Sequence, residues 1–282
     1  MKMKMKLKVA GLATNWIINI VLMAGGLLMM MPFIWAFSTS LRTPLESFSL
    51  PPRWLPTDFI VENYRRVFSL VPFFTFMLNS FKIASLITIG QLATCSTAAF
   101  AFARLRFPGR DVLFMILLSS LMVPIQVTII PIFILMRHAQ LVDTHSSLIL
   151  PVVISAFGVF LLRQFFLTIP RDLEDAAKLD GAGYHTIFFR VFLPLAGPGL
   201  STLAIFCFNY FWNEFFRPLI FLSSLEKMTI PLGLVFLRGY FGVGNASIIL
   251  AGITIAFLPV LIAFLLAQRY LIEGITLTGL KG

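Results

Sequence analysis

Long apolar runs separated by short polar segments dominate the chain. Each run is long enough to cross a bilayer, which takes about 20 residues in a helix. Lipid offers no partners for unpaired backbone groups, so an open-ended apolar run must be helical. The pattern predicts an all-α integral membrane protein with six transmembrane helices. The predicted spans lie near residues 16–38, 73–100, 112–136, 146–168, 196–222 and 247–270.

The composition supports lipid as the solvent of this chain. Hydrophobic residues make up 59% of the 282 residues and charged residues only 12%, whereas soluble domains carry about 25% charged residues. The chain therefore reads as one membrane domain over 1–282. Cys95 and Cys207 both fall inside apolar runs and are expected to be small buried hydrophobes.

The distribution of basic residues predicts the orientation. Lysine and arginine are in excess on the inner side if the N-terminus is cytoplasmic. The net charge of +10 forms no aromatic-interleaved basic patch, so no nucleic acid is expected as a partner. Both termini are predicted to be cytoplasmic. The predicted segments are a basic N-terminus (1–15), an extracytoplasmic loop (39–72), a transmembrane core (73–270) with a cytoplasmic loop (169–195), and a cytoplasmic tail (271–282).

The cytoplasmic loop opens with a charged segment that predicts a short helix. Pro170 suits a first turn, and Asp172 and Glu174 complement the positive end of the helix dipole. Lys178 lies near the negative end, and Gly181 can adopt the left-handed conformation that ends a helix. The segment is therefore expected to be helical from about Pro170 to Gly181.

Leu173, Ala176, Ala177 and Asp180 follow helical spacing and share one face of this helix. The face is narrow and made of small side chains, whereas a helix lying on lipid would carry large apolar residues and lysines. Small residues bordered by charge suit insertion into a groove on another protein. The alternative is a solvated loop helix with incidental alanines.

The same segment resembles the EAA loop of permease subunits in ATP-binding cassette importers. The family pattern is Glu-Ala-Ala, three residues, Gly, nine residues, then Ile-x-Leu-Pro. Here the segment departs from it by Asp175 for Glu and Val191 for Ile, with both spacings kept. Further stretches resemble the carbohydrate (maltose/maltodextrin-like) branch of that family. They are AFARLRFPGR (101–110), PIFILMRHAQLVDT (131–144), LLRQFFLTIP (161–170), KLDGAG (178–183), WNEFFRPL (212–219) and QRYLIEGITLTGLKG (268–282).

The resemblance implies a type I importer permease fold, multi-pass in the cell inner (plasma) membrane. It implies a second homologous permease, two cytoplasmic ATP-binding subunits and an extracytoplasmic solute-binding protein as partners. The loop helix would couple closure of the ATPase to alternating access. ATP and Mg would bind the partner ATPase, and this chain, which lacks a G-x-x-x-x-G-K-[ST] phosphate loop, would hold no cofactor and be no enzyme.

The candidate site residues fall into three groups. Those expected to couple to the ATPase are Leu173, Glu174, Asp175, Ala176, Ala177, Lys178, Asp180, Gly181, Leu193 and Pro194. Those of the tail expected to contact the ATPase pair are Gly279, Lys281 and Gly282. Those of a possible substrate path in the fifth span are Asn209, Trp212, Asn213, Glu214 and Arg217.

Intramembrane charge is unfavourable by several kcal/mol unless it is paired or faces water. Pairing of Glu214 with Arg217, three residues apart, is the structural interpretation, and lining of a sugar path is the alternative. Trp212 could stack on a sugar ring. No metal-ligand spacing or catalytic cluster appears.

Other functions stay open at this point. The same machinery could import glycerol phosphate or another polyol. A self-sufficient secondary transporter would need a coupling carboxylate deep in the bundle and repeated halves, and only Glu214 qualifies.

Overall fold

The regular secondary structure of the described residues is entirely helical. A computed structural model describes residues 2–47, 54–238 and 245–279. The chain divides into two compact units, one of residues 1–70 with 237–255 and one of residues 71–236 with 256–282. This confirms the all-α class, whereas the boundaries of the predicted segments stay predictions.

The helices of the first unit are α1(Lys2–Ser40), α2(Pro44–Ser47), α3(Glu62–Leu70) and the first part of α15(Ala246–Gly279). The second unit holds the rest of α15 and α4(Phe73–Arg104), α5(Arg110–Ser119), α6(Ile125–His138), α7(His145–Ile149), α8(Ala156–Thr168), α9(Arg171–Leu179), α10(Tyr184–Ile187), α11(Leu193–Leu195), α12(Gly197–Trp212), α13(Phe216–Phe221) and α14(Ile230–Phe236). Three-residue 3₁₀ turns η1(Ser120–Met122), η2(Leu150–Val152) and η4(Leu225–Lys227) and a π-helix η3(Phe188–Phe192) complete it.

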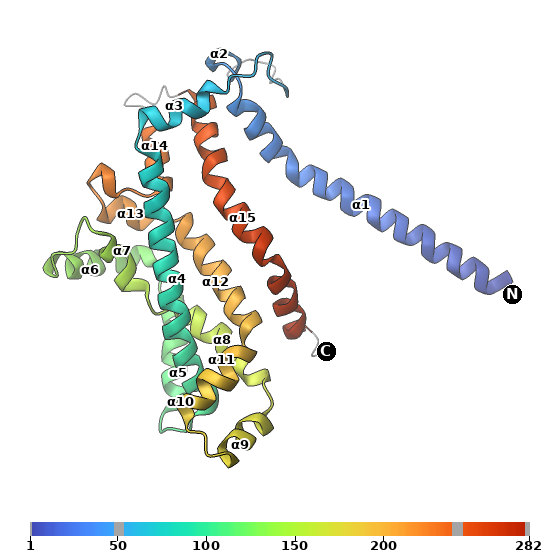
Figure 1. Ribbon diagram of the computed structural model, residues 1–282, viewed down its shortest axis with the longest axis vertical. Helices are drawn as coiled ribbons and strands as arrows, with labels where there is room; N and C mark the ends of the chain where they lie inside the picture. Colours follow the sequence, from blue (N-terminus) through green and yellow to red (C-terminus); the bar gives the residue numbers. More distant parts are fainter. Residues whose placement is uncertain (1, 48–53, 239–244, 280–282) are drawn as a thin grey trace. The chain divides into compact units, whose positions relative to one another are not determined.

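The core of the second unit forms where α4 packs against α8 and α12 (Figure 1). Small residues let these helices approach closely, as is usual for helix pairs in membranes. Gly158 of α8 and Gly199 of α12 are such positions. A Cβ at Gly158 would meet the Cys95 Sγ at 2.8 Å, and one at Gly199 would meet the Phe165 ring at 2.6 Å. Cys95 and Cys207 are buried, as predicted.

Three described helices are long and apolar enough to cross a membrane. They are Ile18–Ser40, Phe73–Arg104 and Ala246–Leu265, which match the first, second and sixth predicted spans. The middle spans are interrupted: helix pairs bent by 101°, 44° and 74° take their places. The described residues thus hold three spans, or up to six if each bent pair counts as one.

Proline explains where the third predicted span departs from a straight helix. The bend of 101° falls between Met122 and Ile125, where Pro124 precedes α6 with an extended backbone. Proline lacks a backbone N–H and pushes the residue before it out of the helical region. The prediction of one continuous helix over 112–136 is therefore wrong.

The fifth predicted span begins close to the expected residue but ends early. Helix α12 ends at Trp212, and the backbone leaves the helical path before α13. Glu214 lies in this break and Arg217 in α13, so the placement of both on one continuous helix over 196–222 is wrong. Asn209 lies inside α12, and Asn213 is the residue that caps its C-terminal end.

The first unit contains a buried polar cluster at the end of α1. The Asn63 side chain donates hydrogen bonds to the carbonyls of Ser40 (2.9 Å) and Arg42 (2.8 Å), which ties α3 to the end of α1. Arg42 is 1% exposed, and its guanidinium donates to the Ser38 hydroxyl at 3.1 Å. The predicted extracytoplasmic loop (39–72) thus contains the nine-residue helix α3.

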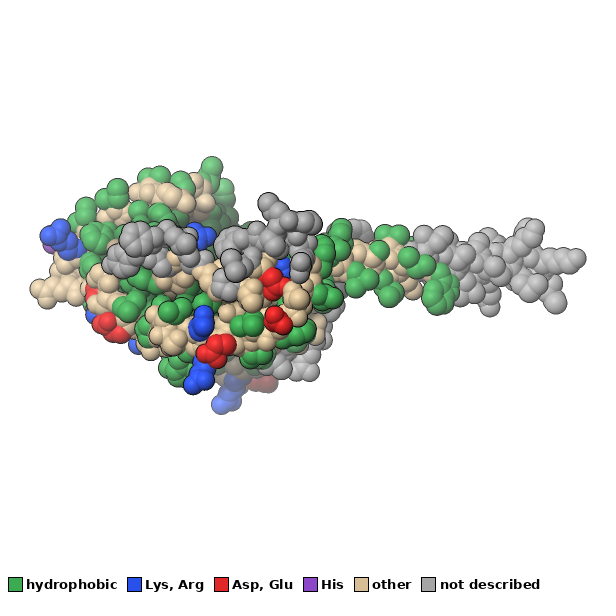
Figure 2. Space-filling view, turned by 90° about the horizontal axis from the view of Figure 1, so that it is seen from above, with side chains coloured by type: hydrophobic (Ala, Val, Ile, Leu, Met, Phe, Trp, Pro, Cys, Tyr) green, Lys and Arg blue, Asp and Glu red, His purple; other side chains and the backbone are tan. Residues whose placement is uncertain are grey.

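The last helix runs further than the sequence predicts. Helix α15 continues to Gly279, so residues 271–279 of the predicted tail are helical, whereas Lys281 and Gly282 lie outside the described residues. Hydrophobic side chains cover much of the described surface (Figure 2). Along α1, for example, Trp16, Met29 and Phe33 are more than half exposed, as expected for helices that meet lipid or other membrane subunits.

Candidate functional site

Helix α9 is the short helix that the charged segment predicts. It spans Arg171–Leu179, with Asp172 and Glu174 in its first turn. Gly181 follows with φ +80°, and its N–H bonds the Lys178 carbonyl at 3.0 Å. The next N–H, of Ala182, bonds the Ala177 carbonyl at 2.9 Å. These two bonds form a Schellman motif, which requires a left-handed residue at the glycine position.

One side of α9 faces away from the rest of the second unit, and α9 lies at the opposite end of that unit from α14 (Figure 1). Leu173 is 43% and Leu179 90% exposed, and Ala176 and Asp180 are exposed beside them. Of the predicted face, only Ala177 turns inward, where it packs against the hydrophobic core. Leu179 was missed by the sequence reasoning, although it lies three residues after Ala176 and so on the same side.

Glu174 is the buried anchor of α9. The residue is 6% exposed. Its carboxylate lies 3.8 Å from the Arg104 guanidinium and accepts a 2.7 Å hydrogen bond from the Lys178 ammonium, which raises the pKa of Lys178. Asp175, by contrast, has a side chain 69% exposed. Glu174 was predicted as a coupling residue, and the structure places it behind the exposed face rather than on it.

Arg104, the last residue of α4, joins three elements at this point. Its guanidinium donates to the carbonyls of Phe166 and Ile169 at the end of α8. It also lies 4.7 Å from the ring centre of Phe192 in the π-helix η3. Five donors in a fixed plane allow arginine to serve several acceptors at once. Arg104 was not singled out as a site residue by the sequence reasoning, because a lone arginine at the end of an apolar run looks like a topology signal.

Leu193 and Pro194, the end of the predicted motif, follow directly after η3. Leu193 packs against the hydrophobic core, whereas Pro194 is exposed. Phe192, immediately before them, is fully buried. Phe192 and Leu193 therefore anchor the end of the cytoplasmic loop in the same hydrophobic core against which Ala177 of α9 packs.

Glu214 and Arg217 form an ion pair, as the structural interpretation predicts. Both carboxylate oxygens of Glu214 accept hydrogen bonds from the Arg217 guanidinium. Arg217 is 1% exposed, donates to the Leu148 carbonyl at 2.8 Å and lies 5.2 Å from the ring centre of Phe211. The buried cation is thus neutralised within the second unit.

A pocket of about 470 Å³ lies beside this pair. Its lining is Ile125, Asn209, Tyr210, Asn213, Glu214, Phe215 and Phe216. It includes three of the predicted path residues. Trp212 is absent from the lining: it is 3% exposed, and its indole N–H donates to the Ala256 carbonyl at 3.2 Å. The interpretation of Trp212 as a sugar-stacking residue is therefore not supported by its placement.

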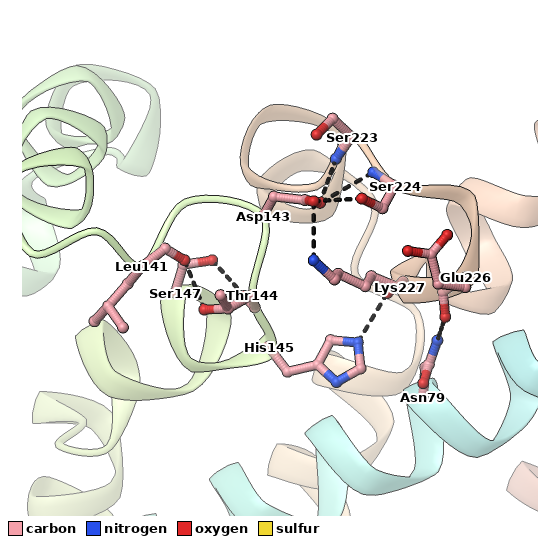
Figure 3. Close-up of polar contacts among 10 residues, drawn as sticks. All are labelled: Asn79, Leu141, Asp143, Thr144, His145, Ser147, Ser223, Ser224, Glu226 and Lys227. Carbon is pink, nitrogen blue, oxygen red and sulfur yellow. Dashed lines mark hydrogen bonds and ion pairs between the residues drawn. The ribbon is translucent and has the colours of Figure 1, made fainter.

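A polar network joins the loop before α7 to the segment after α13 (Figure 3). The Asp143 carboxylate accepts hydrogen bonds from the backbone N–H groups of Ser223 (2.9 Å) and Ser224 (3.0 Å) and from the Ser224 hydroxyl. It also pairs with the Lys227 ammonium at 3.0 Å. These donors, Ser224 first, hold the pKa of Asp143 well below its usual range. His145 contacts the Lys227 carbonyl at 2.9 Å.

Two amide side chains of α4 bond to backbone carbonyls of other segments. Asn79 donates to the Glu226 and Met228 carbonyls, and Gln91 donates to the Val152 carbonyl at 2.7 Å. Within the described part of the chain, no group of three or more His, Cys, Asp or Glu side chains could hold a metal ion.

The sequence and the fold are both similar to those of known transport proteins. The family model described as "Binding-protein-dependent transport system inner membrane component" matches residues 94–276. A solved chain from a bacterial ABC transporter involved in the import of the acidic polysaccharide alginate superposes with a TM-score of 0.80. It is 26% identical, and the match covers 91% of this chain and 96% of that one.

Curated relatives match over most of their length. The arabinooligosaccharides transport system permease protein AraQ of Halalkalibacterium halodurans is 37% identical, covering 80% of this chain and 81% of the relative. The sulfoquinovosyl glycerol transport system permease protein SmoH of Agrobacterium fabrum is 33% identical, covering 97% and 95%. The sn-glycerol-3-phosphate transport system permease protein UgpE of Yersinia pestis is 30% identical, covering 91% and 94%. These relatives do not favour a self-sufficient secondary transporter, and the chain belongs to the family of binding-protein-dependent transport system inner membrane components.

Proposed function

We propose that this chain is a permease subunit of an ATP-driven importer that takes up a sugar or a related polyol delivered by a solute-binding protein. The observation that carries the proposal is α9, a short helix with exposed Leu173, Ala176 and Leu179 on one side and buried Glu174 on the other. A rigidly anchored helix with exposed apolar side chains on one face suits a groove on a partner.

In this proposal, α9 docks in a cleft of a cytoplasmic ATPase subunit. Its exposed face makes the contact. The Asp175 carboxylate is also exposed and lies 3.8 Å from the Lys178 ammonium, so a cation of the partner would compete with Lys178 for it. Glu174 and Arg104 hold the helix against α4 and α8, so displacement of α9 moves the membrane helices with it. The proposal also has Gly279, Lys281 and Gly282 in contact with the ATPase pair, and both termini in the cytoplasm.

The proposed assembly contains a second permease, two ATP-binding subunits and an extracytoplasmic binding protein in the cell inner membrane. ATP and Mg²⁺ would bind the ATPase subunits, so this chain would act as a mechanical rather than a catalytic subunit. Its work would be to change access to a substrate path when the ATPase closes.

The pocket beside Glu214 suits a neutral polyhydroxylated substrate. Asn209 and Asn213 offer amide donors and acceptors, and Tyr210 and Phe216 offer aromatic faces on which a sugar ring can stack. The lining has no lysine or arginine, and Glu214 is already neutralised. This favours a sugar over glycerol phosphate for any substrate contact made by the described residues of this subunit.

The docking proposal can be tested with Leu179→Asp in the importer co-expressed with its partner subunits. Leu179 is 90% exposed, so the substitution leaves the fold of the permease intact. We expect loss of ATPase subunits from the purified complex and of substrate-stimulated ATP hydrolysis in lipid. Leu225→Asp, at an exposed leucine (42%) of the opposite end, is the matched control. Full retention of the ATPase subunits by Leu179→Asp would show that this face of α9 is not the docking surface.

A further inference from the structure

A second pocket lies at the turn between α4 and α5. Its volume is about 560 Å³. Its lining is Arg106, Phe107, Gly109, Arg110, Asp111, Val112 and Arg171. Three arginines therefore line one cavity: two from the α4–α5 turn and its junction with α5, and one that is the first residue of α9. This cavity shares no residue with the exposed face of α9 (Leu173, Ala176 and Leu179) or with the pocket beside Glu214.

The charges in this pocket are not balanced. Arg110 pairs with Asp111 at 2.9 Å, which neutralises one cation. Arg106 and Arg171 are exposed, and neither forms an ion pair within the described residues. The pocket thus keeps an excess of two positive charges, and its free guanidinium groups can bind phosphate oxygens in a bidentate manner.

The surface directly beyond the pocket is apolar. Helix α5 begins at Arg110, and Val112, Met115 and Ile116 on it are 64%, 66% and 60% exposed. This helix belongs to one of the bent pairs that qualify as a membrane span. The arginines therefore lie at the polar end of a lipid-facing surface, which is the depth of the phospholipid headgroups.

We propose that this pocket binds the phosphodiester headgroup of an anionic phospholipid, with the acyl chains along the exposed face of α5. Basic pockets between transmembrane helices bind such headgroups. Arg171 is the first residue of α9, so a bound lipid would connect the membrane surface to the coupling helix. The assignment of the site to the inner leaflet rests on the proposed function, because it follows from the cytoplasmic position of α9. The proposal that the pocket binds a lipid headgroup does not rest on the proposed function.

The test uses the full importer reconstituted in nanodiscs of phosphatidylcholine with phosphatidylglycerol. Native mass spectrometry after mild extraction then compares the two lipids retained. The variant is Arg106→Gln/Arg171→Gln, and the control is Arg137→Gln/Arg238→Gln, which removes the same charge from exposed arginines outside the pocket. Each arginine near a membrane surface contributes about fivefold in affinity, so we expect the variant to lose selectivity for phosphatidylglycerol about thirtyfold and the control to keep it.

Other outcomes would overturn the proposal. If inorganic phosphate or soluble glycerophosphoglycerol displaces phosphatidylglycerol, the pocket is a site for free anions. If the variant keeps its lipid selectivity but loses the ATPase subunits, the arginines contact acidic side chains of the ATPase instead. Because Leu179→Asp tests docking without changing the pocket, failure of the docking proposal and failure of the lipid proposal are distinguishable.

Discussion

The guanidinium of Arg104 lies 3.8 Å from the carboxylate of Glu174, and this contact links the end of α4 to the first turn of α9. Both side chains are almost fully buried, 3% and 8% exposed. Arg104 also holds the last carbonyls of α8. The Arg104 side chain therefore connects α9 to the ends of both α4 and α8.

We expect Arg104→Lys to lower substrate-stimulated ATP hydrolysis at least tenfold, or about 1.4 kcal/mol. Lysine keeps the charge, but its compact ammonium cannot serve the Glu174 carboxylate and two α8 carbonyls in the same plane. Arg190→Lys, at an exposed arginine, should behave like the wild type. The measurement is ATPase activity of the complex in lipid, together with the yield of inserted protein.

A double-mutant cycle then separates the pair from general damage. Arg104→Lys and Glu174→Gln should each lower substrate-stimulated ATP hydrolysis. The double variant should be little less active than either single variant, because both substitutions remove the same contact. Asp175→Asn, on the exposed side, should leave stability unchanged. Strictly additive losses would mean that the two residues act independently.

Gly181 and Gly183 form a matched pair for testing the end of α9. A Cβ would meet nothing within 4 Å at either position, but only Gly181 has a positive φ, of +80°. Gly181→Ala should therefore destabilise the end of α9 by about 1 kcal/mol, and Gly183→Ala should not. Hydrogen exchange at the Ala182 amide, which closes the Schellman motif, reports the difference. Equal exchange in the two variants would contradict the role given to the left-handed residue.

The buried pair Glu214–Arg217 predicts an unequal response to single and double substitution. Glu214→Gln leaves a guanidinium that is 1% exposed without its counter-ion, which should lower stability by about 3–5 kcal/mol. Glu214→Leu/Arg217→Met removes both charges and should lose less. Thermal stability followed by size-exclusion chromatography in detergent measures both. A double variant less stable than Glu214→Gln would show that the pair stabilises the fold beyond mutual neutralisation.

Local chemistry predicted helix α9 well. Charge placement, Pro170 and Gly181 were enough to place α9 within a residue or two, because caps and dipole effects act within one turn. The pairing of Glu214 with Arg217 was likewise predicted from a spacing of three residues. What could not be predicted is which side of α9 turns inward, since that depends on Arg104, far away in sequence.

The bent spans show a second limit of sequence reasoning. The mean hydropathy of a run predicts whether the run lies in lipid. It does not show whether the helix is straight, because a single proline such as Pro124 changes the mean little but bends the backbone strongly. Asp143 is the clearest omission. It lies in a loop, and its partners Ser223, Ser224 and Lys227 meet it only through the fold.

Asp143 predicts a pH-dependent contribution to stability where the loop before α7 meets the segment after α13. Its carboxylate is stabilised in the charged form by the Ser224 and Ser223 donors and by Lys227, so its folded pKa lies below the value of an unfolded chain, about 3.9. A depressed folded pKa means that the contribution is fully present above pH 4 or so. It is then lost as the pH falls toward the folded pKa.

Asp143→Asn should therefore lower the midpoint of thermal unfolding at neutral pH by about 2–4 °C, and the difference from the wild type should shrink as the pH falls below about 4. Asp172→Asn, at an exposed carboxylate of α9, is the control for a general effect of removing a negative charge. The asparagine oxygen can still accept one backbone N–H, but it offers no charge to Lys227, so the hydrogen bonds to the loop weaken without the site becoming apolar. Unfolding midpoints measured from neutral to acidic pH decide the matter: a gap that stays constant across this range would show that Asp143 contributes through shape alone and not through its ionised carboxylate.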